Sequence, residues 1–528
     1  MILRSSKARA AWIMAPLLTS FLLLTSFLMI GLVVVGCRAQ GLPSPEDTPP
    51  RGELRVLIPV EPRSFEPNQP HDEAASVLAS NLFNKLVSFD ADGRLFPDLA
   101  ESLSVGEGGL LYTFHLRRGV LWHDGKPFTS DDVRWTFERL AAAPGLSSEA
   151  IRRIRKVETP DEATVVVRLE EPWAPFLTTL GWYSGFILPR HHPDLREKPV
   201  GTGPFQLGEW VRGKHITLVA NQSFFRPGPY LDRITYTFSS DSLHSAQQLL
   251  SGAVDYTVVR PPVSMIQRLE REPGIRVVSA PSDARIYCAF NLRRPALADP
   301  RVREAINRAI DRQQILERAL HGFGTPALGF YTPAISWAYN GDAHVPAHDP
   351  ALARQLLAAA GQSALELELL TPPVSPYADI ARLLAEQLNA AGIRIRLVLS
   401  PLNQLQERAM ARHDFDLVLI AGSQGPDPEN LNLRFGSRGA MQFMGYSSPE
   451  LDAALAEGSR TVDLTRRTRA YFRAQEILAR DLPIAPIVEG VHLSFIRRGI
   501  HGLPQVEARG LVPVNDYSLV RVEPAPSS

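Results

Sequence analysis

A loop rich in glycine, proline and polar residues holds the side chains best suited to bind a ligand. It occupies residues 420–435 (IAGSQGPDPENLNLRF) and follows an apolar run that predicts a strand. Loops at the carboxyl ends of strands are the usual binding places in α/β sheets. The candidate ligand-binding residues in this loop are Ser423, Gln424, Gly425 and Asp427. The Asp427 carboxylate could pair with an ammonium group of a ligand. Alternatively, Asp427 is a turn residue between two prolines, with no role in binding.

Three side chains outside this loop are further candidates for ligand contact. Trp182 and Tyr183 could line a cleft with aromatic surface, although packing inside a domain is the preferred interpretation. Arg285 could meet a carboxylate, or it could be an exposed arginine beside a hinge.

The other reactive residue types are not arranged for catalysis or metal binding. His123, His191 and His192 do not recur with Cys or His at the spacing of metal ligands. No G-x-S-x-G elbow occurs, and Cys288 lies in the apolar run 286–290, as a small core residue does. We therefore expect no enzyme activity, no metal and no cofactor.

Composition points to a large folded chain without a nucleic-acid surface. The 528 residues predict two or more domains, and 45% hydrophobic residues suit a globular core. Lys and Arg together number 56, as do Asp and Glu, and no long basic run occurs.

The N-terminus has the layout of an export signal. Three basic residues lie within the first nine positions, and residues 10–36 carry no charge. The end of this stretch, residues 34–37, resembles the lipobox of bacterial lipoproteins, in which the cysteine (Cys37 here) takes lipid. An uncleaved membrane anchor is the alternative, because the stretch is long enough to span a bilayer. Either interpretation puts the rest of the chain outside the cytoplasm, behind a Pro-rich tether at 37–52.

Strand patterns dominate the first half of the chain. Thr129 and Asp132 form a capping box that predicts the start of a helix, and residues 122–125 predict a tight turn. The predicted strands, rich in β-branched and aromatic residues, are 54–58, 110–116 and 164–169.

In the second half, helices and strands alternate. Asp299-Pro300 and Asp349-Pro350 each predict a helix start, with Gly322 and Gly361 as the stops. Strands are predicted at 365–370, 393–399 and 415–420, with helices at 380–389 and 402–411 between them. This alternation indicates βαβ units and a mostly parallel sheet.

Several blocks, taken in order, resemble one known family. They are 99–133 (LAESLSV to SDDV), 201–205 (GTGPF), 221–238, 290–291, 299–324 and 446–452 (YSSPELD). Together they resemble family 5 of the bacterial extracellular solute-binding proteins, the dipeptide-, oligopeptide- and nickel-binding relatives. The blocks span nearly the whole chain after the tether.

The resemblance implies an α/β fold, a two-lobed periplasmic-binding-protein clamshell with mixed sheets and an inserted subdomain in the first lobe. The expected divisions are a signal at 1–36, a tether at 37–52, lobe one at 53–80, 200–283 and 490–528, the insertion at 81–199, and lobe two at 284–489.

The resemblance also implies a function. We expect an extracytoplasmic, monomeric substrate-binding component of an ABC importer that captures peptides between its lobes. Its partners would be the permease and ATPase subunits and, through a lipid anchor, the membrane. The alternatives are a receptor of the same fold for an oligosaccharide, an opine-like compound or a metal chelate, and an extracytoplasmic hydrolase.

In peptide-binding relatives the 420–435 loop carries an Asp that pairs with the peptide's α-ammonium. Alignment on Pro426-Asp427-Pro428 places Gln424 at that position. A neutral amide cannot supply the charge-assisted hydrogen bond that a buried ammonium needs. Either Asp427 holds an amine after a shift of the loop, or the ligand has no free amine, or Asp427 is only a turn residue.

Overall fold

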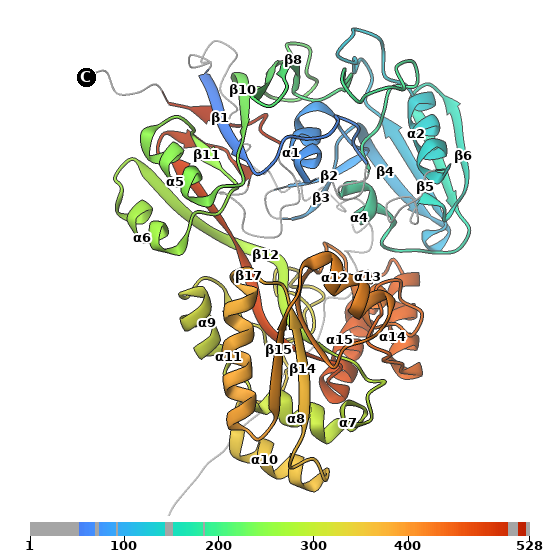
Figure 1. Cartoon of the computed structure of the whole chain (residues 1–528). Helices are drawn as coiled ribbons and strands as arrows, with labels where there is room; N and C mark the ends of the chain where they lie inside the picture. Colours follow the sequence, from blue (N-terminus) through green and yellow to red (C-terminus); the bar gives the residue numbers. More distant parts are fainter. Residues whose placement is uncertain are drawn as a thin grey trace, which may run out of the picture. The chain divides into compact units, whose positions relative to one another are not determined.

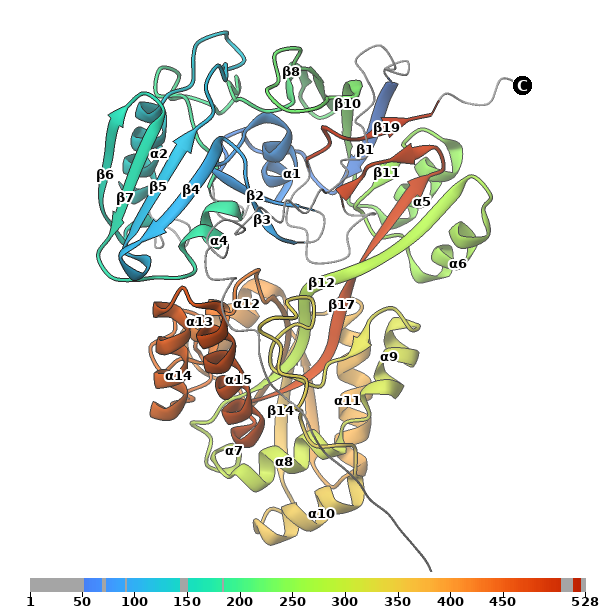
Figure 2. The same cartoon turned by 180° about the vertical axis from the view of Figure 1, so that it is seen from behind.

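Two long neighbouring strands, β12 (Ile275–Phe290) and β17 (Ile484–Arg497), form the centre of the fold in the computed structural model (Figure 1). They pair antiparallel within an 11-stranded mixed sheet. Ten of its strands follow the order β15-β14-β16-β12-β17-β11-β1-β10-β9-β8, and the eleventh, β13, pairs with β17 beside this path. Figures 1 and 2 show both strands running from the group of elements around β1 into the group around β14. The structure describes residues 52–68, 73–90, 93–142, 151–182, 185–504 and 516–523.

The first lobe contains the β1 side of the sheet. Its strands are β1 (Gly52–Ile58), β8 (Phe205–Val211), β9 (His215–Ala220), β10 (Leu231–Phe238) and β11 (Tyr256–Thr257). β1 is parallel to both β10 and β11. Leu54, Val56 and Ile58 enter one buried cluster and Leu57 another, so β1 is covered on both faces. The strand predicted at 54–58 is confirmed.

Helices cover both faces of this half-sheet. They are α1 (Glu73–Leu82), α5 (Ser242–Ser251) and α6 (Val263–Arg271). Residues of α1 enter the cluster that contains Leu54, and residues of α5 and α6 enter the cluster that contains Leu57. A short pair, β18 (Ile500–His501) and β19 (Arg521–Val522), lies near the C-terminus.

The chain between β1 and β8 forms a separate four-stranded sheet. Its order is β4 (Ala100–Gly106), β5 (Leu111–Leu116), β7 (Thr164–Leu169) and β6 (Ile154–Asp161). Alternate residues of β7 are buried, as the pattern predicts. The same region holds β2 (Val87–Phe89), β3 (Leu95–Pro97), η2 (Glu107–Gly109), α2 (Ser130–Ala142) and α4 (Phe176–Gly181). At the start of α2, Asp132 Oδ2 accepts the Thr129 N–H at 3.0 Å, which is half of the predicted capping box.

The second lobe combines parallel and antiparallel strands. β14 (Glu366–Thr371) is parallel to β15 (Arg394–Leu399) and β16 (Leu417–Ser423), whereas β12 and β17 are antiparallel to their neighbours. The helix between β14 and β15 is α11 (Tyr377–Ala390). The mostly parallel sheet predicted for this region therefore holds for three strands, and the two long strands make the sheet mixed.

Two predicted helices differ from the structure. The helix expected from Asp299 to Gly322 is divided into α8 (Pro300–Ala309) and α9 (Arg312–Leu320), because the Asp311 carboxylate caps the second helix by accepting the Gln314 N–H at 2.9 Å. The helix expected at 402–411 is α12 (Leu402–Gln406) followed by a π-helical turn, η3 (Glu407–Ala411).

The remaining elements of this lobe complete its two buried clusters. They are α7 (Pro295–Ala298), β13 (Thr325–Pro326), α10 (Pro350–Ala359), α13 (Glu429–Phe435), α14 (Pro449–Arg460) and α15 (Leu464–Asp481). The α14 end also reaches the inserted subdomain, where the Ala174 N–H donates to the Ser459 carbonyl at 2.8 Å.

The predicted signal segment, Cys37 and residues 37–51 of the tether lie outside the described residues. Within the described ranges, no helix has the length and apolar character needed to cross a membrane.

Candidate ligand-binding site

The loop predicted to bind ligand follows β16 directly. β16 is buried along residues 417–420 and pairs with β14 on one side and with β12 on the other, where Ser423 lies opposite Ala284. The chain then turns through residues 424–428 and begins α13 at Glu429. The loop thus lies at the carboxyl end of a central strand, beside the two strands that run through both lobes.

Gln424 is buried and faces a carboxylate of the protein itself. Only 6% of the residue is exposed, and its amide Nε2 donates to Glu489 Oε2 at 3.2 Å. The other oxygen of Glu489 accepts from Arg285 Nε at 2.9 Å. A buried cation, a buried anion and a neutral amide are therefore joined in one group with no net charge.

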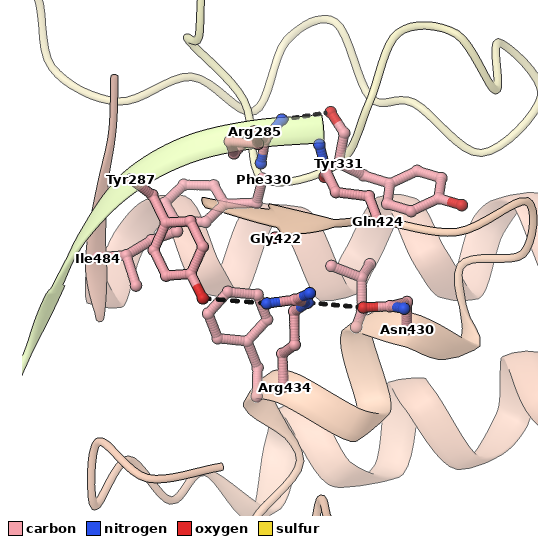
Figure 3. Close-up of a pocket in the computed structure, with 11 residues that line it drawn as sticks. Arg285, Tyr287, Phe330, Tyr331, Gly422, Gln424, Asn430, Arg434 and Ile484 are labelled. Carbon is pink, nitrogen blue, oxygen red and sulfur yellow. Dashed lines mark hydrogen bonds between the residues drawn. The ribbon is translucent and has the colours of Figure 1, made fainter. Parts of the chain in front are cut away.

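Arg285 is buried, so its predicted alternative as an exposed hinge arginine is wrong. The residue is 3% exposed and lies directly opposite Glu489 in the β12–β17 ladder. Its Nη2 also donates to the Tyr331 carbonyl at 2.8 Å (Figure 3). Burial is possible because the carboxylate on the neighbouring strand compensates the guanidinium charge.

Asp427 is occupied by protein partners. The side chain is 9% exposed, and Arg467 Nη2 donates to its two oxygens at 2.8 and 3.0 Å. Oδ1 also accepts the Glu429 N–H at 3.0 Å, and Oδ2 accepts the Thr178 hydroxyl at 3.2 Å. Asp427 thus supports the turn into α13 and forms a buried ion pair with α15, and the ion pair neutralises its charge.

Ser423 and Gly425 are held by a carboxylate that lies on β12. The Ser423 hydroxyl and the Gly425 N–H both donate to Asp283 Oδ2, the latter at 3.1 Å. The Gly425 carbonyl accepts the Tyr331 hydroxyl at 3.2 Å. Burial raises the pKa of Tyr331 well above its ordinary value, so the phenol remains a neutral donor. Gly425 has φ +63°, a left-handed conformation that favours glycine.

Trp182 lies at the contact between the inserted subdomain and the second lobe. Its ring meets Phe89 edge-on with centroids 6.0 Å apart, and it also packs against the second-lobe cluster that contains Tyr331 and Leu431. Packing only within the insertion was the preferred prediction, and the second-lobe contact corrects it. Tyr183 lies outside the described residues.

Arg434 on α13 reaches back to the end of β16 (Figure 3). Its guanidinium donates to the Ser423 carbonyl at 2.7 Å, to the Tyr287 hydroxyl at 3.0 Å and to Asn430 Oδ1 at 2.7 Å. A Cβ on Gly422 would lie 2.5 Å from Arg434 Nη2, so a larger residue here would force the guanidinium to shift from its place against the strand.

A small cavity of about 20 Å³ lies between this guanidinium and the core. Its apolar wall is formed by Phe330, Leu431, Phe435 and Ile484, and its polar wall includes Gln424 and Arg434 (Figure 3). A space of this size holds about one water molecule.

The histidines and Cys288 are bound to, or buried among, protein groups. His123 Nδ1 accepts the Gly201 N–H, and its Nε2 lies 3.1 Å from the Gly203 carbonyl. Among the described residues, no group of three or more His, Cys, Asp or Glu is placed to hold a metal ion. Cys288 is fully buried, and burial raises the pKa of its thiol, which disfavours the nucleophilic thiolate.

Comparison with known proteins places the chain in a family. Residues 94–443 match the family described as "Bacterial extracellular solute-binding proteins, family 5 Middle". The chain belongs to this family. The matched range includes the 420–435 loop, β12 and most of the inserted subdomain, so the loop and Arg285 lie within the matched region, whereas Glu489 on β17 lies beyond it.

Members of family 5 resemble the chain over most of its length. The peptide transport periplasmic protein SapA of Salmonella typhimurium is 30% identical over 465 residues, covering 81% of this chain and 84% of SapA. A dipeptide-binding protein of Pseudomonas aeruginosa is 30% identical over 486 residues, covering 84% and 90%. The family resemblance predicted from the sequence blocks is confirmed.

A solved structure of a periplasmic binding protein has the same fold. DppA of Helicobacter pylori, in complex with the peptide STSA, superposes with a TM-score of 0.75 at 25% identity, over 90% of this chain and 98% of DppA. The two-lobed periplasmic-binding-protein fold predicted for this chain is confirmed. The relatives are named as binding or transport proteins, and none of the three is named as an enzyme.

Sequence reasoning did not identify Asp283, Glu489 or Arg434 as residues of the site. Arg434 follows Asn430 by one helical turn inside the loop motif, which is a signal that could have been used. Asp283 and Glu489 belong to distant strands and carry no local motif, so only the fold brings them to the loop.

Proposed function

We propose that this chain is the substrate-binding component of an ABC importer for peptides, working as a monomer outside the cytoplasm. The observation that carries the proposal is the family match, which includes the binding loop and β12, one of the two strands that join the lobes. Ligand capture between lobes would shift the protein toward a closed state that the permease recognises. The ATPase subunits would then drive transport.

We further propose that lobe one comprises 53–80, 200–283 and 490–528, with 81–199 inserted and lobe two at 284–489. The separate hydrophobic clusters support this division, since the insertion has its own cluster around Tyr112 and Phe114. The first-lobe cluster also takes in Phe186, Leu188 and Leu195, which favours an earlier return of the chain to lobe one.

The ligand can be identified directly. Native mass spectrometry of the purified chain should show bound peptide, and added peptides should raise the melting temperature by mass action. Sugars, opine-like compounds and metal complexes should leave it unchanged. A chain that melts higher only with a non-peptide solute would contradict the peptide proposal.

We also propose that the chain is not an enzyme. Its best placed nucleophile by residue type, Cys288, is fully buried with a raised thiol pKa. Turnover of a chromogenic ester or peptide would contradict this, and the hydrolase alternative predicts such turnover.

A receptor for a solute without a free amine is the second candidate. It is favoured by one observation: Gln424 is neutral, and the charge of Asp427 is already compensated by Arg467. Equal binding of free and N-acetylated peptides, or of amine-free solutes alone, would support this candidate.

A further inference from the structure

We propose that Asp283 is the carboxylate that pairs with a ligand ammonium group at this site. The inference rests on the proposed solute-binding function and narrows its substrate class to solutes with a free amine, such as peptides with an unblocked N-terminus.

Two carboxylates around the loop, Asp283 and Glu429, have no cation partner in the described part of the chain, but both oxygens of Glu429 are occupied, by the Asn432 amide and the Ser459 hydroxyl. Asp427 is paired with Arg467, and Glu489 is paired with Arg285, each pair being buried. Asp283 has no Lys, Arg or His nitrogen within ion-pairing distance among the residues that the structure describes. A half-buried carboxylate next to neutralised pairs is the one that attracts an incoming cation.

A β-bulge aims Asp283 at the loop. The β12–β17 register shifts between Pro281 and Arg285, so three residues of β12 lie opposite Gly490 alone. Bulges of this kind redirect a side chain and are common beside functional sites. Inside the bulge, the Ser282 hydroxyl accepts the Ala284 N–H at 3.0 Å, which fixes the backbone on both sides of Asp283.

Only one oxygen of Asp283 is used by the loop. Oδ2 accepts from the Ser423 hydroxyl and the Gly425 N–H, while the Asp283 carbonyl accepts the Gln424 N–H at 2.9 Å. Oδ1 accepts no hydrogen bond from the described part of the chain. The carboxylate is thus oriented in advance and has a free acceptor for an ammonium group.

A positive charge also contacts Ser423, at its backbone carbonyl. The Arg434 guanidinium donates to the Ser423 carbonyl, and no described carboxylate pairs with it. Three of its five N–H groups have partners, which leaves donors for an oxygen of the ligand. Together, Asp283 and Arg434 suit a solute that carries an ammonium group a few atoms from a carbonyl or carboxylate oxygen.

The substitution Asp283→Asn removes the negative charge of this side chain and keeps its ability to accept hydrogen bonds. The amide oxygen of Asp283→Asn can accept the same two loop hydrogen bonds, so the fold should be kept while the negative charge is lost. Asp232→Asn on the exposed face of β10 removes the same charge far from the loop and serves as the matched control. Thermal melting of both variants checks that they fold.

Calorimetry with trialanine and N-acetyl-trialanine tests the inference on the full chain. The wild type should bind trialanine, and N-acetyl-trialanine at least tenfold more weakly. Asp283→Asn should weaken trialanine binding by ten- to a hundredfold and leave the acetylated peptide unaffected, whereas Asp232→Asn should change neither.

The outcomes distinguish the two proposals. If trialanine binds and Asp283→Asn has no effect, the inference is overturned and the peptide function stands. If peptides fail to bind but a non-peptide amine binds and loses affinity in Asp283→Asn, the peptide function is overturned and the inference stands. If only amine-free solutes bind, both are overturned.

Discussion

At the scale of single residues, the buried charges of the binding loop and its surroundings are compensated by opposite charges on other elements, whereas Arg312 is buried and donates only to backbone carbonyls and Asn307. Arg467 is an example: burial alone would lower its pKa, but Asp427 raises it, and the guanidinium also lies over the rings of Trp337 and Tyr471. Compensation of this kind explains why Asp427 is a poor candidate for ligand binding and why Asp283 is a better one.

The residue that would anchor the chain gives the first prediction. Cys37 is the only residue placed to take lipid after the uncharged stretch, so Cys37→Ser should move the protein from the detergent phase to the aqueous phase. Cys288→Ser, at a buried cysteine, is the control for loss of a thiol. Equal partitioning of the Cys37 variant and the wild type would indicate an ordinary membrane anchor instead.

His123 should make the free energy of unfolding depend on pH. Burial lowers the pKa of His123 from 6.5 to about 4, and the hydrogen bond to Gly203 opposes this only in part. Because the unfolded chain binds the proton more readily, stability should be complete above pH 6.5 and fall as pH drops from 6.5 to 4. The loss should be at most about 3.5 kcal/mol, at about 1.4 kcal/mol per pKa unit.

Urea denaturation of the wild type and His123→Gln between pH 4 and 7 measures this effect. The difference in unfolding free energy between the two proteins should change across that interval, since all other titrating groups are shared. A constant difference would show that His123 does not titrate differently in the folded and unfolded chains.

At the scale of elements, β12 and β17 are joined by charge as well as by their backbone ladder. Arg285 and Glu489 lie opposite each other in that ladder, and β13 adds a further backbone pair at Glu489. Gln424 connects the same pair to the end of β16, so three strands meet at one buried group. The geometry of the loop therefore depends on strands that lie far from it in sequence.

Loss of the Arg285–Glu489 ion pair should lower the free energy of unfolding. Glu489→Gln leaves the Arg285 charge buried without a carboxylate, so the free energy of unfolding should fall by about 3–5 kcal/mol. Glu209→Gln, which removes a carboxylate from the exposed contact with His215, should change it by less than about 0.5 kcal/mol. Urea denaturation compares the two. Equal stability of Glu489→Gln and wild type would mean that the Arg285 charge finds solvent or another acceptor.

At the scale of the whole molecule, two strands cross between lobes that have separate hydrophobic clusters. The clusters around Leu54 and Leu57 belong to the first lobe, and those around Cys288 and Tyr287 belong to the second. Lobes with separate cores can move as rigid bodies, with bending confined to the connecting strands.

Ligand binding should therefore make the molecule more compact. Small-angle X-ray scattering should give a smaller radius of gyration with a saturating peptide than without it, and the same peptide should raise the melting temperature. An unchanged radius together with a raised melting temperature would show binding without closure of the lobes.

The sequence alone determined the local elements and the family of this protein. The strand at 54–58 and the helix starts at Asp299 and Asp349 depend on neighbouring residues, so short-range patterns suffice to predict them. The ordered blocks along the chain resemble family 5, and that resemblance implied the two-lobed fold. The loop after β16 was also predicted correctly in position, because it follows an apolar strand.

Only the tertiary structure decided which charges in the site are free. Asp427 meets Arg467 across 40 positions of sequence, and Arg285 meets Glu489 across 204. Such ion pairs cannot be predicted from local sequence patterns, because they form only when the fold brings distant strands and helices together. Asp283 was absent from the sequence prediction for the same reason: a bulge in β12, visible only through its pairing with β17, turns its carboxylate toward the loop.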